Sequence, residues 1–431
     1  MTDTALAQPL TLPCGATLGN RLAKAAMTEG LATPAGLPSP QLERLYSLWS
    51  DGGAGLLLSG NIIIDGDHLE RPGNVVIERR PDAPMAAALA SWARAATRRG
   101  NHFWGQISHA GRQTQKAVNP RPKAPSAVQL GLPGGQFGQP QAMSQADIAQ
   151  VVERFAWCAA ALREAGFTGV QVHAAHGYLL SQFLSPRSNL RDDDYGGALE
   201  NRARLLLQTV AAVRAAVGTD FPLAVKLNSA DFQKGGFDFH DSLQVARWLE
   251  QAGIDLLEIS GGTYEQPKLL GVAGLEAEEP QAVRASTRAR EAYFVDFAVA
   301  MREQLSVPLM VTGGFRSRAA MEQALDSGAA VIGLGRPMCV MTDAPSRLLR
   351  GAAQLPRYED ELAMFPPWLA FLNRSDTLRT LGAFGVQYWY YAQLDLLGRD
   401  GRAQESLGVF AATRRVMRHA RRWLQQRRRL L

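Results

Sequence analysis

Short apolar runs alternate with longer amphipathic stretches through most of the chain. Eight runs rich in Val, Ile and Leu predict buried strands of a parallel sheet. They are AKAAMT from Ala23, GLLLSG from Gly55, HFWGQIS from His102, GVQVHA from Gly169, LAVKLN from Leu223, LLEISG from Leu256, PLMVTG from Pro308 and VIGLGR from Val331. Stretches with helical periodicity lie between them, at residues 83–99, 146–165, 200–217, 240–252, 291–305 and 318–327. Eight strand–helix units in series predict a closed (β/α)8 barrel, with an open doubly wound sheet as the alternative.

The pattern changes after the eighth run. Residues 1–354 are expected to form the barrel and residues 355–431 a helical extension, which includes the aromatic run at 388–391. Near the C-terminus an apolar stripe recurs at about half-heptad spacing: Phe410, Val416, Met417, Ala420, Trp423 and Leu424. Arginines occupy positions between them, so the segment predicts a basic amphipathic helix. Packing against the barrel or a partner subunit is the favoured hypothesis, and binding to nucleic acid or an anionic membrane is the alternative.

The positive charge of the chain is concentrated in this last segment. Its final 18 residues hold eight arginines and no acid, and without them the formal net charge of +6 becomes −2. The body of the protein is therefore not expected to bind polyanions. Cys14, Cys158 and Cys339 are widely separated and form no C-x-x-C pattern, which argues against a disulfide framework or an iron–sulfur site. Neither a run of 18 apolar residues nor a secretory signal pattern occurs, so the cytoplasm is the expected location.

Polar residues and glycines gather at the C-terminal ends of the predicted strands, where barrel active sites lie. The long interruption at residues 113–144 is rich in Pro, Gly and Gln, and it predicts a loop that covers this face. The last two strands end in TGGFRS (312–317) and GLGRPM (333–338), and loops at these positions commonly bind phosphate in this fold. No G-x-G-x-x-G opens a helix after an early strand, so a Rossmann-type dinucleotide site is not predicted. A phosphate site without an adenylate site favours FMN over FAD.

Four segments together resemble the old yellow enzyme family of NAD(P)H:flavin oxidoreductases, and the resemblance covers roughly residues 10–346. The segments are LGNRLAKAAMTEG (18–30), WGQISHAGRQT (104–114), GVQVHAAHGYLLSQFLSPRSNLRDDDYGGALENRARLL (169–206) and the two loops at 312–338. The third segment is long and specific, whereas each of the others is weak alone. The resemblance implies an FMN-binding barrel that takes electrons from NAD(P)H.

The resemblance also implies a set of flavin-binding residues. Those expected to line the ring are Ala25, Ala26, Met27, Thr28, Gly60, Gln106 and Lys226, and those expected to hold the phosphate are Gly313, Gly314, Gly335 and Arg336. The Thr28 hydroxyl would donate to the O4 carbonyl of the flavin, and Gln106 would bind its pyrimidine side. Gly60 would leave room for the ring edge. Lys226 would lie near N1 and the C2 carbonyl, where negative charge collects on reduction.

Three residues of the HAAHGY motif match the substrate site of the family. The resemblance implies that His173 and His176 bind the electron-withdrawing group of the substrate, which makes the β-carbon a better hydride acceptor. It implies that Tyr178 donates a proton to the α-carbon. An H-x-x-H pair can also bind a metal, but no third ligand follows at a recognisable spacing, so no metal is expected. A purely structural role for these residues is the remaining interpretation.

Two positions depart from the pattern of the family. Many members carry Tyr where this chain has Gly30, which predicts an open wall on the substrate side, and many carry Arg where it has Lys226. The predicted activity is NAD(P)H-dependent reduction of an enone, a nitroalkene or a quinone. The alternatives are an FMN barrel dehydrogenase or demethylase of the same superfamily, a hydrolase with paired carboxylates, and a non-catalytic binding protein that uses its basic tail. Assembly into a homo-oligomer is left open.

Overall fold

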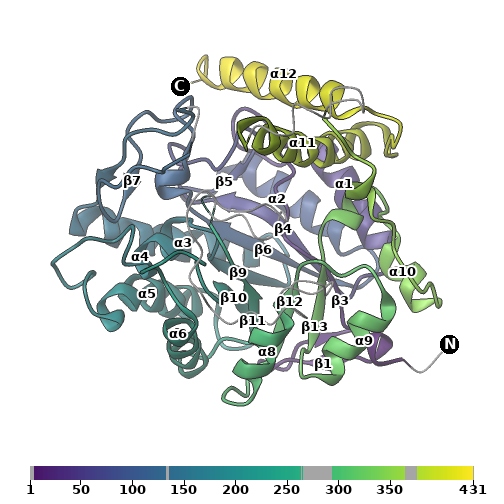
Figure 1. Cartoon of the computed structure of the whole chain (residues 1–431), viewed down its shortest axis with the longest axis horizontal. Helices are drawn as coiled ribbons and strands as arrows, with labels where there is room; N and C mark the ends of the chain where they lie inside the picture. Colours follow the sequence, from purple (N-terminus) through teal and green to yellow (C-terminus); the bar gives the residue numbers. More distant parts are fainter. Residues whose placement is uncertain (1–3, 133–134, 264, 266–293, 365–375, 431) are drawn as a thin grey trace.

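Eight parallel strands close into a barrel in the computed structural model, which describes residues 4–132, 135–263, 265, 294–364 and 376–430 (Figure 1). They are β3 (Leu22–Lys24), β4 (Leu56–Ile63), β6 (His102–Ser108), β9 (Gly169–Ala174), β10 (Leu223–Asn228), β11 (Leu256–Ser260), β12 (Leu309–Thr312) and β13 (Val331–Leu334). The ring closes because β13 pairs with β3, and β3 pairs in turn with β4. The predicted (β/α)8 barrel is confirmed.

Helices surround the barrel and follow the predicted periodicity closely. They are α1 (Pro40–Asp51), α2 (Ala83–Ala96), α3 (Gln145–Glu164), α4 (Leu179–Leu184), α5 (Leu199–Val217), α6 (Phe239–Gln251), α8 (Val295–Arg302), α9 (Arg318–Asp326) and α10 (Ala344–Leu349). Side chains cap the N-termini of α1, α2, α3, α6 and α9 by accepting a backbone N–H, which explains why these helices begin where they do. The helix predicted at residues 291–305 is confirmed over α8, and residues 291–293 lie outside the described part.

Shorter elements connect and close these units. The strands β1 (Leu10–Thr11) and β2 (Thr17–Leu18) form an antiparallel hairpin, and β5 (Val75–Val76) pairs with the end of β4. The strands β7 (Lys123–Ala124) and β8 (Gln141–Ala142) pair within the predicted covering loop. The 3-10 helices of the described residues are η1 (Ala5–Ala7), η2 (Gly111–Gln113), η4 (Arg336–Cys339) and η5 (Tyr358–Asp360).

The interior of the barrel is divided into an apolar layer and a polar layer. The apolar layer is defined here as Ala23, Leu56, Leu58, Trp104, Ala224, Leu256, Met310 and Val331, which form one buried cluster with Leu12 and Leu18 of the N-terminal hairpin. Two residues further along four of these strands come Gln106, Lys226, Glu258 and Thr312, which share the inward face because strand side chains alternate. Together with Gln171 of β9 they are the polar layer. Both layers are buried, so they differ in the polarity of their side chains and not in their exposure to solvent.

A close approach at the start of β9 helps the apolar layer to form. The indole of Trp104 lies 2.5 Å from the point where a Cβ would stand at Gly169, the first residue of β9. Any larger residue at position 169 would displace this buried ring. Glycine at the start of β9 is therefore required by packing.

The C-terminal extension packs against the barrel as two further helices, α11 (Asp376–Asp400) and α12 (Val409–Arg427), which lie over α1 in Figure 1. Trp423 joins a buried cluster with Ile63, Leu69 and Val76, and its indole N–H donates to the carbonyl of Ala32 at 2.9 Å. The guanidinium of Arg427 donates to the backbone carbonyls of Pro34, in the loop after β3, and of Gly66, in the loop after β4. The prediction of a basic amphipathic helix is confirmed. No helix among the described residues is long and apolar enough to cross a membrane.

Two residues of the predicted apolar stripe are not part of the contact. Val416 and Trp423 are buried, but Phe410 and Met417 are exposed, so assigning these two to the buried stripe was wrong. In a helix, residues i and i+1 point about 100° apart, and Met417 follows the buried Val416 directly. The true buried face is narrower than the predicted stripe.

Candidate functional site

The three residues of the HAAHGY motif come together where β9 ends. The ring of His173 lies 5.1 Å from that of His176 and 4.8 Å from that of Tyr178, and both pairs are close to perpendicular. The sharp turn that achieves this places His176 at φ 60°, a left-handed conformation that few non-glycine residues adopt. The amide of His176 donates to the Asn228 side chain at 3.0 Å, which holds the turn. The predicted triad is therefore one cluster at the C-terminal end of the barrel.

Both imidazoles are held neutral. Burial, followed by the neighbouring His176 and the Lys226 ammonium, keeps the pKa of His173 well below its ordinary value, and burial and Lys226 do the same for the pKa of His176. The Nδ1 atom of His173 accepts the backbone N–H of Ala175 at 3.2 Å. Its single proton is therefore on Nε2, where it is available to a ligand. The Nε2 atom of His176 is hydrogen-bonded to the Ser260 hydroxyl at 2.7 Å.

The polar layer forms a continuous chain of hydrogen bonds below this cluster. Gln106 donates through Nε2 to Gln171 at 2.6 Å, and Gln171 donates to the carboxylate of Glu258 at 2.8 Å. Lys226 Nζ lies 3.0 Å from the same carboxylate, which also accepts the Thr312 hydroxyl at 2.7 Å. His173, Lys226 and Glu258 are register partners on β9, β10 and β11. The two residues predicted to bind the flavin from this side, Gln106 and Lys226, are thus brought together.

A second buried group of charges lies below the segment that follows β3. Lys24 donates to the carbonyl of Leu58 at 2.6 Å and lies 3.6 Å from the Glu29 carboxylate, which also accepts the hydroxyl of Tyr46. Burial lowers the pKa of Lys24 to about 8, and Glu29 partly opposes this shift. A Cβ at Gly60 would come within 2.2 Å of the Glu29 carboxylate. Glycine is needed at position 60 for this contact within the protein, independently of the predicted role of Gly60 beside the flavin ring.

The segment predicted to line the flavin ring leaves the barrel directly after β3. Ala25 still donates its N–H to the carbonyl of Leu334 at 2.9 Å, and Ala26, Met27 and Thr28 follow as partly exposed residues without regular structure. The Met27 sulfur lies 3.4 Å from that of Cys339, which connects the segment to η4. Thr28 shares a hydrogen bond with the buried carboxyl of Glu70, whose pKa is raised by burial. The charge of Arg71 and the hydrogen bond with Thr28 partly oppose this rise of the pKa.

The wall beside Gly30 is not open, so that prediction was wrong. The guanidinium of Arg71 lies 3.2 Å from the point where a Cβ would stand at Gly30. The ring of Tyr391 from α11 stacks on the Arg71 guanidinium at 3.7 Å. An arginine from the loop after β4 therefore fills the space that a side chain at position 30 would need, and an aromatic ring from the C-terminal extension contacts this arginine. No local sequence signal indicates this contact, because the three residues are far apart in the chain.

The predicted phosphate residues lie at the ends of β12 and β13. Gly313 and Gly314 have φ values of 129° and 82°, and a Cβ at Gly335 would meet nothing closer than the Met27 sulfur at 4.0 Å. The side chain of Arg336 pairs with Glu359 of η5 at 3.3 Å. This glutamate also binds Arg316 at 2.6 Å and accepts the Tyr390 hydroxyl of α11 at 2.9 Å.

Glu359 is ionised between these two arginines. Burial raises the pKa of its carboxyl, but Arg336 and Arg316 outweigh burial and bring that pKa below its ordinary value. Sequence reasoning missed both Arg316 and Glu359, although Arg316 lies within the TGGFRS loop. The C-terminal extension therefore reaches the predicted phosphate end of the site as well as Gly30.

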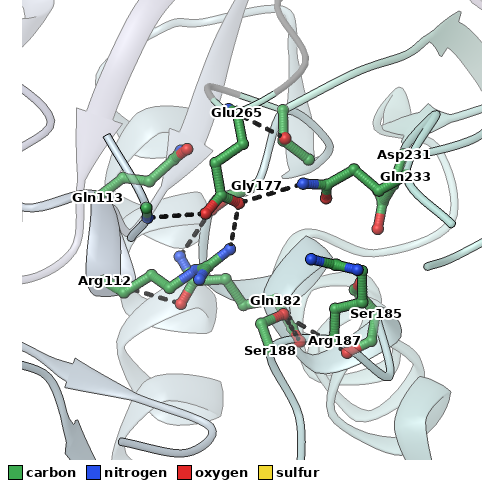
Figure 2. Close-up of polar contacts among 12 residues, drawn as sticks. Arg112, Gln113, Gly177, Gln182, Ser185, Arg187, Ser188, Asp231, Gln233 and Glu265 are labelled. Carbon is green, nitrogen blue, oxygen red and sulfur yellow. Dashed lines mark hydrogen bonds and ion pairs between the residues drawn. The ribbon is translucent and has the colours of Figure 1, made fainter. Parts of the chain in front are cut away.

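Loops that follow β6, β9 and β11 are joined by hydrogen bonds and an ion pair (Figure 2). Arg112, which follows β6, forms a buried ion pair with Glu265 at 2.8 Å, and Glu265 also accepts the N–H of Gly131 in the covering loop at 2.9 Å. Gln113 donates to the carbonyl of His176 at 3.0 Å. Gln182 connects the loops by accepting the N–H of Arg112 at 3.1 Å and donating to the carbonyl of Gly177 at 2.7 Å. These contacts fix the HAAHGY turn from outside and were not predicted.

A different histidine pair resembles a metal site in composition but not in hydrogen bonding. Asp65, His68 and His109 could offer ligand atoms within 4.8 Å of one another. However, His68 Nε2 accepts the N–H of Lys123 at 2.8 Å, and His109 Nδ1 accepts the N–H of Gly111 at 3.0 Å. Each imidazole therefore uses its lone pair on a backbone donor, and a metal would have to displace a proton from the other nitrogen. The arrangement favours a structural role.

Comparisons with known proteins agree with this geometry. The profile of the NADH:flavin oxidoreductase / NADH oxidase family matches residues 5–354. An NADH-dependent flavin oxidoreductase of Talaromyces variabilis is 34% identical over 93% of this chain and 100% of that protein. One from Neonectria sp. is 39% identical over 79% of this chain, which spans only 46% of the length of that relative. The structure of the old yellow enzyme homologue from Zymomonas mobilis superimposes with a TM-score of 0.68 at 26% identity, over 82% of this chain and 95% of that one.

Proposed function

This chain belongs to the NADH:flavin oxidoreductase / NADH oxidase family, and on that premise we propose that it reduces small molecules with an activated C=C bond, or quinones, with electrons from NAD(P)H. The grouping of His173, His176 and Tyr178 at the end of β9 is the observation that supports this activity, because it places two donors beside one acid. The family match confirms the predicted cofactor, FMN, and its reduction by NAD(P)H.

The residues at this end of the barrel fit FMN. The polar layer offers an amide and an ammonium group, from Gln106 and Lys226, suited to the carbonyl oxygens and ring nitrogens of the pyrimidine part. On the other side of the same site, after β13, the space around the Gly335 backbone and the nearby Arg336 suit a phosphate group. The bound flavin supplies the chemistry of accepting a hydride from NAD(P)H and passing it to the substrate.

The two histidines would hold the electron-withdrawing group of the substrate. His173 has its proton on Nε2. His176 is hydrogen-bonded through Nε2 to the Ser260 hydroxyl, and when Nε2 accepts that hydroxyl the proton of the imidazole is on Nδ1. Two neutral donors attract a carbonyl or nitro oxygen and stabilise the negative charge that develops there during the reaction. Because both pKa values are lowered, these donors keep one protonation state across neutral pH.

Tyr178 would deliver the proton. Its ring is buried against His173, in a place fixed by the start of α4, where the backbone N–H of Leu179 donates to the carbonyl of His109 at 3.0 Å. A phenol is a weak acid, so it gives up its proton only as negative charge grows on the α-carbon. Reduction of an alkene needs this proton, whereas a quinone takes its protons at oxygens that water can serve.

The test begins with the purified protein. We expect a yellow protein that releases FMN on denaturation, and loss of the yellow colour when NADH or NADPH is added without oxygen. Addition of an enone to the reduced protein should then restore the colour with formation of the saturated ketone. A protein that is colourless and takes up no FMN would contradict the proposal, and so would a flavoprotein that NAD(P)H reduces but that no enone, nitroalkene or quinone reoxidises.

A further inference from the structure

Glu258 is a fully buried carboxylate that the proposed reaction does not use directly. It has no exposed surface, and its two oxygens are bound by Lys226 at 3.0 Å, by the Thr312 hydroxyl at 2.7 Å and by Gln171 at 2.8 Å. Burying a carboxylate is costly unless it is paired and hydrogen-bonded. Here both conditions are met, and the partner charge is the one predicted to face the reduced flavin.

The charges around this position can be accounted for one by one. Lys226 and Glu258 are direct register partners on adjacent strands and form one neutral pair. Lys24 and Glu29, the other buried pair of this region, also sum to zero. The field of a neutral pair falls off faster than that of a lone cation, so Lys226 attracts negative charge less strongly than its ammonium would alone.

The hydrogen bonds extend the influence of Glu258 across the barrel. Gln171 donates to Glu258 and accepts from Gln106, so the orientation of Gln106 depends on the carboxylate two steps away. An amide that donates to a carboxylate has its own oxygen fixed toward the next donor. Glu258 therefore sets both the charge of Lys226 and the direction of Gln106, which are the two side chains predicted to bind the pyrimidine part of the flavin.

We propose that Glu258 is a positioning residue that sets the reduction potential of the bound flavin, by partly neutralising Lys226 from below and by fixing the Gln171–Gln106 chain. The proposal rests on the proposed function, because it requires bound FMN with its pyrimidine part toward the polar layer. Glu258 touches neither flavin nor substrate in this account, and it acts through its neighbours.

The potential distinguishes this role from a structural one, because the two partners should shift it in opposite directions. Glu258→Gln keeps an acceptor for Lys226 and removes the negative charge, so it should raise the midpoint potential of the flavin. Lys226→Met leaves an unpaired carboxylate and should lower that potential. Each change should alter the equilibrium constant for flavin reduction by roughly one to two orders of magnitude, which is the size of one charge-assisted interaction. The double variant removes one charge of each sign and should return close to the wild-type value.

The measurement is an anaerobic redox titration of the FMN-loaded protein against a reference dye, with thermal melts of each variant. Thr312→Val is a second, charge-conserving probe of the carboxylate, because it removes a hydrogen bond to Glu258 without changing any charge. The carboxylate is then less well compensated, so the midpoint potential should fall slightly. Should Glu258→Gln fail to fold, Lys226→Arg, Lys226→Met and Thr312→Val decide the question. The cation-retaining variant should stay near wild type, and the other two should fall.

Shifts of the same sign in Glu258→Gln and Lys226→Met would overturn the proposal, as would an unchanged potential in Glu258→Gln or in Thr312→Val. Failure of the proposed function looks different, because then the wild-type protein either retains no FMN or holds a reduced flavin that no enone, nitroalkene or quinone reoxidises. A wild-type flavoprotein whose potential ignores Glu258 would refute this inference alone.

Discussion

The two layers of the barrel interior share four strands and are both buried, yet one is apolar and the other polar. In the apolar layer, Trp104 and Met310 pack against other apolar side chains and take no part in the hydrogen-bonded chain of the polar layer. In the polar layer, two residues further along, Gln106 and Thr312 take part in a hydrogen-bonded chain. Burial alone therefore does not distinguish the apolar core of the barrel from its polar functional layer. In barrels of this type, the end from which the strands start is devoted to stability, and the end where they finish to function.

The polar layer is stable because its members satisfy one another. Lys226, Glu258 and Gln171 each contact at least one other member at 3.0 Å or less. A buried polar group without a partner would cost roughly 1–3 kcal/mol. We therefore expect substitutions in the polar layer and at its mouth to change chemistry first, and substitutions in the apolar layer to change stability first.

The largest effect is expected from Tyr178→Phe, at the mouth of the polar layer. Loss of a general acid should slow the reoxidation of the reduced flavin by an enone by roughly 10²- to 10⁴-fold, while flavin reduction by NAD(P)H stays close to normal. Stopped-flow absorbance of the two half-reactions, kept apart without oxygen, measures both. Tyr195→Phe, which removes a hydroxyl that donates to Gln208 at 3.1 Å, is the control. Equal slowing of both halves would mean that Tyr178 shapes the site instead of donating the proton.

Trp104→Ala tests the apolar layer. Removing this fully buried indole should lower the free energy of unfolding by roughly 3–5 kcal/mol, because a large cavity remains between the strands. The flavin potential should stay near the wild-type value. Chemical denaturation and redox titration give the two quantities, and Trp157→Ala, at an exposed tryptophan of α3, is the matched control. A variant of normal stability with an altered potential would reverse the assignment of the two layers.

His173→Ala should weaken binding without affecting the fold strongly. Loss of one donor to a charged oxygen costs about 1.5–3 kcal/mol, so the affinity for phenol-like ligands and for enones should fall roughly 10- to 100-fold. Titration of the bound flavin absorbance with a phenol gives the dissociation constant. His240→Ala, at an exposed histidine of α6, should leave it unchanged. Unaltered phenol binding in His173→Ala would remove this residue from the substrate site.

The smallest effect is expected outside the barrel, at Arg427 of α12. Its guanidinium donates to the carbonyls of Pro34 and Gly66 at 3.2 and 3.1 Å from a partly exposed position. Arg427→Ala should cost about 1 kcal/mol of stability or less and leave both half-reactions intact. Arg429→Ala, at an exposed residue of the same helix end, should cost nothing measurable in the same denaturation experiment. A changed half-reaction in Arg427→Ala would show that the extension acts on the chemistry.

The strands could be predicted because each is buried on both faces and reads as a short apolar run. The first run shows where that signal ends. AKAAMT was predicted as one strand, but β3 stops at Lys24 and the chain then leaves the barrel, with only Ala25 still bonded to β13. Small apolar residues fit a strand and an exposed wall equally well. The pattern therefore located the segment and not its conformation.

The polar layer could have been predicted in part. Gln106, Lys226, Glu258 and Thr312 each follow an apolar inward residue by two positions, which is a strand period. Which of them pair depends on the register between strands, and composition does not reveal it. The Arg71–Tyr391 contact over Gly30 lay entirely beyond prediction, because it joins a loop and a helix through a stacking geometry that no sequence spacing encodes.

The bond from Trp423 to Ala32 also has a meaning for the order in which the protein is made. The two residues are separated by 391 positions in the chain. Because ribosomes add about 5–20 residues per second, Trp423 is synthesised roughly 20–80 s after Ala32. The pairing of β13 with β3 is delayed almost as long, and until then both flanking strands of the nascent sheet expose unpaired edges. Chaperones that shield such edges during translation are therefore expected to raise the yield of this protein.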